Sequence, residues 1–170
     1  MIPPRNTNEV VIESITQAMA AMIVDRPFEE ITVTELVRRA GVSRNSFYRN
    51  FRDKEDVLRR YIEGETEEWI GRSGWVHVVD PEENRLRMEH LLLHMYEYRD
   101  FVAGLMRDGK MHQMAAEFAR ATKQNIGRYY DPWRLAFLIG GVYQLYVHWV
   151  ETDYALPPKE VAALFDTFEI

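Results

Sequence analysis

The chain has 170 residues, of which 46% are hydrophobic and 28% are charged, a composition typical of ordinary globular proteins. It contains no cysteine, which excludes disulfides and thiolate catalysis and suits a reducing cytoplasm. The net charge of −6 is divided unevenly, because residues 1–60 carry +1 and residues 61–170 carry −7. The N-terminal stretch Met1–Asn6 lacks the hydrophobic run of a signal peptide, so we expect a cytoplasmic protein.

The first predicted helix follows an N-terminal arm. Asn6 and Glu9 fit a capping pattern, and the apolar residues that follow recur at helical spacing. Pro27 cannot continue a helix and also restricts the residue before it, so the helix should end near Asp25. We interpret this helix as a scaffold for the segment that follows it.

The segment from Ile31 to Tyr61 carries explicit signals for short helices and turns. Thr32 and Glu35 form a capping-box pattern, which predicts a helix over residues 33–39. Gly41 supplies the left-handed residue of a sharp turn, and Ser43 can cap a second helix over residues 44–51. Asp53 can cap a third helix that begins at Lys54. A helix, a tight glycine turn and a second helix predict a helix-turn-helix.

The second of these short helices has a polar outer side. Phe47 and Phe51 stand four residues apart and are predicted to face inward, which leaves amide, hydroxyl, phenol and guanidinium groups outside. Such groups read base edges and bind phosphates. Residues 37–60 carry eight basic and three acidic side chains, a net +5 within an acidic chain. A solvated basic surface is the alternative, but the agreement of caps, turn and charge favours a DNA interface.

The same segment resembles the DNA-binding domain of the tetracycline-repressor (TetR) family of bacterial transcription regulators. The resemblance runs from about Val10 to Tyr61 and is most specific at Ile31–Val33, Ala40–Ser43, Phe47–Phe51 and Lys54–Glu55. It implies an all-α fold, with a three-helix DNA-binding domain over residues 1–53 and a helical effector-binding and dimerisation domain over residues 54–170.

The resemblance also implies which residues contact DNA. Arg44, Asn45 and Ser46 correspond to positions that read bases in the family, and Arg49 to one that reads bases or binds phosphate. Asn45 and Asn50 depart from the residues common there, which leaves the operator sequence open. The full predicted set is Thr32, Thr34, Ser43, Arg44, Asn45, Ser46, Tyr48, Arg49, Asn50 and Lys54.

The rest of the chain is predicted to be helical, with a loop at residues 71–74 and an unassigned apolar run at residues 75–79. A break is expected at Arg99-Asp100 and a stop near Gly109. The expected helices cover residues up to 98, 101–106, 111–127, 133–150 and 161–168.

The segment Trp133–Val150 is mostly apolar and allows two readings. A membrane span is one, but Arg134 and His148 lie within the segment and Gly140-Gly141 interrupts it. A helix that is apolar around most of its circumference is instead buried or shared with a second subunit. In the family, the last two long helices of each subunit form a dimer interface, so we expect a dimer helix and no membrane association.

No catalytic motif or cofactor is predicted, because no phosphate loop or paired-carboxylate motif stands out. His90 and His94 have a spacing that can chelate a metal, but no further ligands are suitably placed, so no metal site is expected. Methionine and aromatic side chains could instead line an adaptable effector pocket. The predicted pocket residues are Trp69, Met95, Tyr96, Met106, Met114, Tyr143, Gln144 and His148.

Together with these features, the resemblance implies a homodimeric transcriptional repressor that binds a palindromic operator and is released by a small-molecule effector. The alternative is a TetR-like co-activator or binding module that acts through a protein partner.

Overall fold

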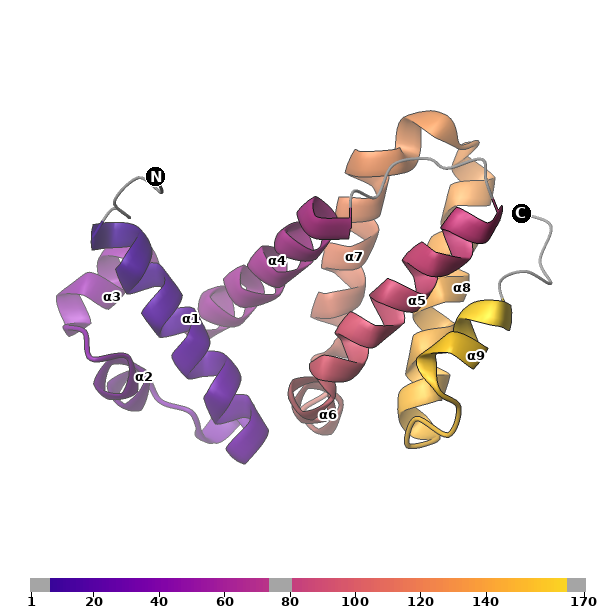
Figure 1. Cartoon of the computed structure of the whole chain (residues 1–170). Helices are drawn as coiled ribbons and strands as arrows, with labels where there is room; N and C mark the ends of the chain where they lie inside the picture. The colour runs from indigo at the N-terminus through magenta and orange to yellow at the C-terminus, as the bar shows by residue number, and fades with distance from the viewer. Residues whose placement is uncertain (1–6, 74–80, 165–170) are drawn as a thin grey trace, which may run out of the picture. The chain divides into compact units, whose positions relative to one another are not determined.

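A computed structural model describes residues 7–73 and 81–164, and within them every regular element is helical (Figure 1). The side chains of residues 69–73 and of a few residues near position 82 lie outside this description. The chain divides into two compact units. The N-terminal unit comprises the residues up to Gly64 together with Asp100–Met111, and the C-terminal unit comprises Glu65–Arg99 and the residues from His112 onward.

The N-terminal unit is built on α1, which runs from Thr7 to Asp25 and packs against the two helices of the predicted helix-turn-helix. These are α2, Val33–Ala40, and α3, Arg44–Asn50. A short 3-10 helix, η1 (Phe28–Glu30), connects α1 to α2, and α4 (Lys54–Ser73) follows α3. The core between them consists of buried apolar side chains: Ile15, Met19, Ile23, Phe28, Ile31, Leu36, Phe47, Phe51, Val57 and Leu58.

Helix α6, Arg99–Arg107, completes the N-terminal unit although it lies far along the chain. Gly104 lets α6 approach α1 closely, because a Cβ at this position would stand 2.5 Å from Cγ2 of Ile23. The Arg107 guanidinium donates to the carbonyl oxygens of Ile23 and Arg26, each at 2.7 Å. Asp108 accepts a 2.8 Å hydrogen bond from the Phe28 amide. The carbonyls of Ile23 and Arg26 at the end of α1 therefore accept from a guanidinium that lies 84 and 81 residues later in the chain.

In the C-terminal unit, α5 (Pro81–Glu97), α7 (Met111–Ile126) and α8 (Pro132–Glu151) run alongside one another, with α9 (Pro158–Ala163) against α5 (Figure 1). Asp131 caps α8 by accepting hydrogen bonds from the amides of Trp133 and Arg134. The central cluster of buried side chains comes from α5, α7 and α8: Leu91, Phe118, Ala121, Ile126, Leu135, Ile139 and Val142.

The turn between α8 and α9 is organised by Trp149. Its indole nitrogen donates a 2.7 Å hydrogen bond to the Leu156 carbonyl, and its ring meets the Tyr154 ring edge-on at 5.0 Å. The Tyr96 ring of α5 contacts the Tyr154 ring at 5.1 Å. These contacts direct the chain from the end of α8 back onto α5.

Two sequence predictions for these helices are wrong. Residues 71–73 form the last turn of α4 rather than a loop, since one glycine in a helix costs only about 1 kcal/mol. The break before α6 falls at Tyr98, and Arg99 and Asp100 begin the helix, where an acidic side chain is favourable. The run 75–79 and the end of the predicted helix 161–168 fall outside the described residues. No helix within the described ranges is long and apolar enough to span a membrane.

Candidate nucleic-acid interface

The first turn of α2 is fixed by the predicted capping box. The Thr32 hydroxyl accepts a hydrogen bond from the Glu35 amide at 3.3 Å, and the Glu35 carboxylate accepts from the Thr32 amide at 3.2 Å. The Thr32 hydroxyl also donates to that carboxylate at 2.7 Å, and Arg26 donates to it at 3.0 Å. Hydrogen bonds from Thr32 and Arg26 lower the pKa of Glu35 to about 2. The Glu35 carboxylate therefore remains ionised at neutral pH, and the capping box stabilises the first turn of α2.

The turn and the start of α3 also follow the prediction. Gly41 adopts the left-handed conformation at φ 67°, and the Val42 amide donates to the Val37 carbonyl at 3.0 Å. Ser43 then caps α3, since its hydroxyl accepts from the Ser46 amide at 3.0 Å. A helix of seven residues has little stability of its own, so these caps and the core contacts must hold it.

The inner side of α3 is aromatic, as predicted. Phe47 is fully buried and its ring centroid lies 5.7 Å from that of Phe51. The opposite side consequently faces solvent. Asn45, Tyr48 and Arg49 are all exposed there, and Tyr48 retains 60% of its accessible surface while its ring rests edge-on against Phe47.

Several of the predicted DNA-contacting residues already use their polar groups within the fold. The Ser46 hydroxyl is 3.0 Å from that of Ser43, and the Asn50 amide donates to the Ser46 carbonyl at 2.8 Å. The guanidinium of Arg44 donates to the Thr34 hydroxyl, which joins α3 to the first turn of α2. These hydrogen bonds fix the geometry of the surface. They also occupy polar groups that would otherwise be free to contact DNA.

Lys54 is the clearest case of a residue with an internal role. Its ammonium donates to the Phe28 carbonyl at 2.9 Å and to the Glu29 carbonyl at 3.1 Å. It also lies 4.5 Å from the centre of the Phe28 ring, and the Lys110 ammonium lies 4.4 Å from the same centre. Since an ammonium has three donors, at most one remains for a phosphate. The sequence patterns showed no sign of this structural role.

Asn45 and Arg49 differ from these residues. Within the described part of the chain, neither side chain has a hydrogen-bond or ion-pair partner, and both are exposed on α3. An amide and a guanidinium displayed on a rigid helix are the groups that pair with adenine and guanine edges in a major groove. Together with the exposed Tyr48, they form the part of the predicted site best placed to read DNA.

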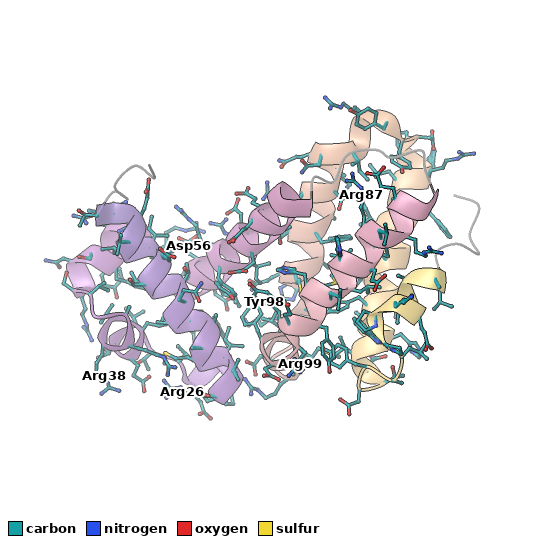
Figure 2. All side chains as sticks on the ribbon, viewed as in Figure 1. Arg26, Arg38, Asp56, Arg87, Tyr98 and Arg99 are labelled. Carbon is teal, nitrogen blue, oxygen red and sulfur yellow. The ribbon has the colours of Figure 1, made fainter. Side chains whose placement is uncertain are left out.

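A surface cleft of about 470 Å³ separates the end of α1 from α2. Arg26 and Arg38 lie at this edge of the unit (Figure 2), and Arg26 and Arg39 pair with the acidic residues of the cleft, Glu35 and Asp25, at 3.0 and 3.6 Å. Its arginines are therefore mostly neutralised locally, and we assign no ligand to it.

The predicted effector residues lie in both units, and the effector pocket stays a prediction. Met106 lies on α6 in the N-terminal unit, while Met95 and Tyr96 lie on α5, and the side chain of Trp69 is outside the description. Gln144 and His148 were predicted to face a pocket, but both are exposed on α8, whereas Met114 and Tyr143 are half-buried. The apolar pattern of α8 did not show which of its sides faces inward.

The buried polar groups of the C-terminal unit are different residues. Thr122 and Tyr146 each retain 1% of their accessible surface, and the Thr122 hydroxyl has no hydrogen-bond partner among the residues that the structure describes. Burial raises the pKa of Tyr146, which keeps the phenol neutral. No group of three potential metal ligands occurs in residues 7–73 and 81–164.

Known proteins resemble both the sequence and the fold. Residues 15–61 match the model described as bacterial regulatory proteins, tetR family. The HTH-type transcriptional regulator YxbF of Bacillus subtilis is 28% identical over 104 residues, which cover 58% of this chain and 27% of that protein. The nucleoid occlusion factor SlmA of Idiomarina loihiensis is 32% identical over 83 residues, 49% of this chain and 41% of that one. The matched regions thus span less than half of these relatives.

Solved structures match nearly the whole chain. The TetR family repressor AlkX from Dietzia superposes with a TM-score of 0.57 at 12% identity, covering 92% of this chain and 91% of that one. The fatty acid degradation regulator FadR from Bacillus halodurans gives 0.55 at 15% identity, covering 94% and 92%. These likenesses concern the fold, whereas the sequence match concerns the helix-turn-helix. The helix-turn-helix at residues 15–61 is therefore that of the tetR family of bacterial regulatory proteins, and the whole chain shares its fold with these two solved regulators.

Proposed function

We propose that the chain is a sequence-specific DNA-binding regulator of transcription that acts as a homodimer in the cytoplasm. One observation carries the proposal: Asn45, Tyr48 and Arg49 project from the outer side of α3, which Ser43 caps and whose inner side is buried. The net +5 of residues 37–60 supplies the attraction to phosphates that most DNA binding requires. The acidic remainder of the chain, residues 61–170, would repel DNA and so favour binding at the outer side of α3.

A homodimer would present two copies of α3 to one face of the duplex. Two-fold symmetry then requires a palindromic operator whose half-sites lie one helical turn apart, about 34–36 Å. The Arg44–Thr34 contact would hold α3 against α2 while α3 occupies the major groove.

The test begins with DNA selected from a random pool, because the operator is unknown. We expect Asn45→Ala to cost about 1–3 kcal/mol of binding free energy on the selected site and to relax one base position. Arg49→Ala should also lower the dependence of log K on log salt by about one unit. Fluorescence anisotropy at several salt concentrations measures both effects. Equal losses on selected and random DNA for Asn45→Ala would rule it out as a base reader.

We further propose that the regulator is a repressor and that a small molecule bound in the C-terminal unit releases it from DNA. The fold supports this proposal, since it is shared with proteins named as a repressor and as a regulator of fatty acid degradation. A ligand can act in this way only if it binds the free form more tightly than the DNA-bound form. A compound that binds the C-terminal unit and leaves operator affinity unchanged would not be the effector.

A second function is favoured by one relative, which is named as a nucleoid occlusion factor rather than as a transcription regulator. In that alternative the protein would act through a protein partner. Expression of a reporter placed behind the selected operator discriminates the two: repression that depends on Arg49 supports transcriptional control, and its absence despite operator binding supports the alternative.

A further inference from the structure

The start of α4 holds two kinds of group that ordinarily bind a phosphate, and the fold occupies both. The Lys54 ammonium donates to two backbone carbonyls. The Asp56 amide donates to the Asp53 carboxylate at 2.8 Å, and the Arg52 amide donates to the Asp56 carboxylate at 3.2 Å. A DNA phosphate at this end of α3 therefore needs donors other than Lys54 and these amides.

Two arginines at the junction of α3 and α4 have guanidinium groups that the fold does not use. Arg52 directly follows the C-cap of α3, and Arg60 lies on α4. Both side chains are exposed, and neither guanidinium has a hydrogen-bond or ion-pair partner among the residues that the structure describes. The Asp56 carboxylate, which feels the charge of Arg52, is buried and paired with Arg59 at 2.6 Å. Arg52 and Arg60 thus remain available to an anion.

The position of Arg60 is fixed beside the end of α3, although the residue belongs to α4. Its guanidinium carbon lies over the Phe51 ring, 5.8 Å from the ring centre, and Phe51 is the C-cap of α3. Stacking on a ring face leaves the edge of a guanidinium, with its N–H groups, able to bind another group. The adjacent Arg59 is instead bound by the Asp56 and Glu63 carboxylates. Of these two neighbouring arginines, only Arg60 is therefore available to DNA.

The C-terminal end of α3 is the part of the proposed interface that lies nearest to the DNA backbone. A helix of seven residues is about 10 Å long, and the major groove is about 12 Å wide. When the N-terminal residues of such a helix contact base edges, as proposed for Asn45, its other end lies near a wall of the groove, where the phosphates are. Arg52 and Arg60 are located at that end.

We propose that Arg52 and Arg60 bind phosphates of the operator at the wall of the major groove, in the place that the sequence predicts for Lys54. The inference rests on the proposed DNA-binding function and names residues that anchor α3 in the groove. Phosphate contacts position a protein on the duplex and carry no sequence information. The two arginines therefore set affinity and salt dependence, and the base sequence is read by other residues of α3.

Salt-dependent binding, measured by fluorescence anisotropy, tests the two arginines separately. Arg52→Gln and Arg60→Gln should each lower the slope of log K against log salt by about one unit for each bound copy, on selected and random DNA alike. For each bound copy, the loss of affinity should then shrink about tenfold for every tenfold rise in salt. Arg39→Gln is the matched control, because it removes the same charge from a guanidinium that is paired with Asp25 at 3.6 Å. Its slope should equal that of the wild type.

Lysine variants distinguish a charge contact from a structural role. Arg52→Lys and Arg60→Lys should keep the slope of the wild type, since an ammonium binds phosphate as a point charge. Thermal melting followed by circular dichroism should show that all four variants fold, because both positions are exposed. A lysine variant that folds and has the slope of its glutamine counterpart would contradict a phosphate contact.

Chemically altered DNA tests the contact on the wild-type protein. Phosphates of the selected site are replaced one at a time by neutral methylphosphonate. A replacement that weakens the wild type at the contacted phosphate should have little further effect on Arg52→Gln or Arg60→Gln, because the variant has already lost that contact. Losses that are fully additive at every phosphate of the site would overturn the inference.

The outcomes separate this inference from the proposed function. If both glutamine variants keep the slope of Arg39→Gln while operator binding is retained, the arginines are not phosphate ligands, and the proposed function still stands. A wild-type protein that binds neither selected nor random DNA at low salt overturns both.

Discussion

Replacing Gly104 by alanine tests whether α6 is an integral part of the N-terminal unit. A Cβ at this position would lie 2.5 Å from Cγ2 of Ile23 and 2.7 Å from the Ile23 carbonyl oxygen. Atoms do not approach so closely, so α6 or the end of α1 must move. The same carbonyl accepts the 2.7 Å hydrogen bond of Arg107, and a shift of either helix weakens that bond as well.

The magnitude follows from opposing effects. Alanine improves helix propensity by about 1 kcal/mol, whereas overpacking costs about 1–3 kcal/mol and a weakened hydrogen bond about 1 kcal/mol more. We therefore expect Gly104→Ala to lower the free energy of unfolding by about 2 kcal/mol. Gly64→Ala is the matched control, because Gly64 is an exposed helical glycine and a Cβ added there would meet nothing within 4 Å. It should raise the stability by about 1 kcal/mol.

Urea unfolding followed by circular dichroism measures both variants, and operator binding by anisotropy shows whether the loss reaches the DNA-binding surface. If Gly104→Ala stabilises the protein as much as Gly64→Ala does, then α6 does not pack closely on α1 and the composition of the N-terminal unit is wrong.

Three further predictions concern residues whose roles the structure defines. Lys54→Ala should lower the free energy of unfolding by about 1–2 kcal/mol, because the Lys54 ammonium donates to two carbonyls. It should lower the dependence of log K for DNA binding on log salt less than Arg49→Ala does. An unchanged melting temperature would refute the structural role of Lys54. The lowered pKa of Glu35 means that its carboxylate stabilises the fold above pH 4.5 and loses this effect as the pH falls toward 2, so acid titration should narrow the stability difference between the wild type and Glu35→Gln. Thr122→Val should raise the melting temperature, because it removes a buried hydroxyl that has no hydrogen-bond partner among the described residues. The expected gain in stability is about 1 kcal/mol, and a fall in the melting temperature would reveal a hydrogen bond to that oxygen.

The helix-turn-helix could be predicted almost to the residue because its signals are local. The capping box at Thr32, the left-handed Gly41 and the cap at Ser43 each act within four residues of the chain. The periodic aromatic pair Phe47 and Phe51 then fixes which side of α3 is buried. In such a segment the sequence pattern and the tertiary structure point to the same answer.

The features that escaped prediction depend on contacts between distant residues. Lys54 looks like a phosphate ligand until its carbonyl partners near Phe28 are known. The buried and exposed sides of α8 could not be told apart from the sequence, because large apolar side chains such as Trp133 and Phe137 also occur on its exposed side. For the same reason the sequence did not show that Gln144 and His148 lie on the exposed side of α8.

The N-terminal unit has a consequence for the order of folding, because it is made from two separated parts of the chain. Residues 65–99 of the C-terminal unit are synthesised between the end of its first part and the start of α6. Until the ribosome has released residue 111, the carbonyls at the end of α1 lack the guanidinium of Arg107 and the Phe28 amide lacks Asp108. The chain between Gly64 and Asp100 must form a closed loop, and the entropic cost of that closure comes before the stabilising contacts of α6 can form. The nascent helix-turn-helix should therefore reach its full stability only after residues 65–99 of the second unit have been synthesised. The formation of the proposed DNA-binding surface is thereby coupled to the synthesis of the unit proposed to control it.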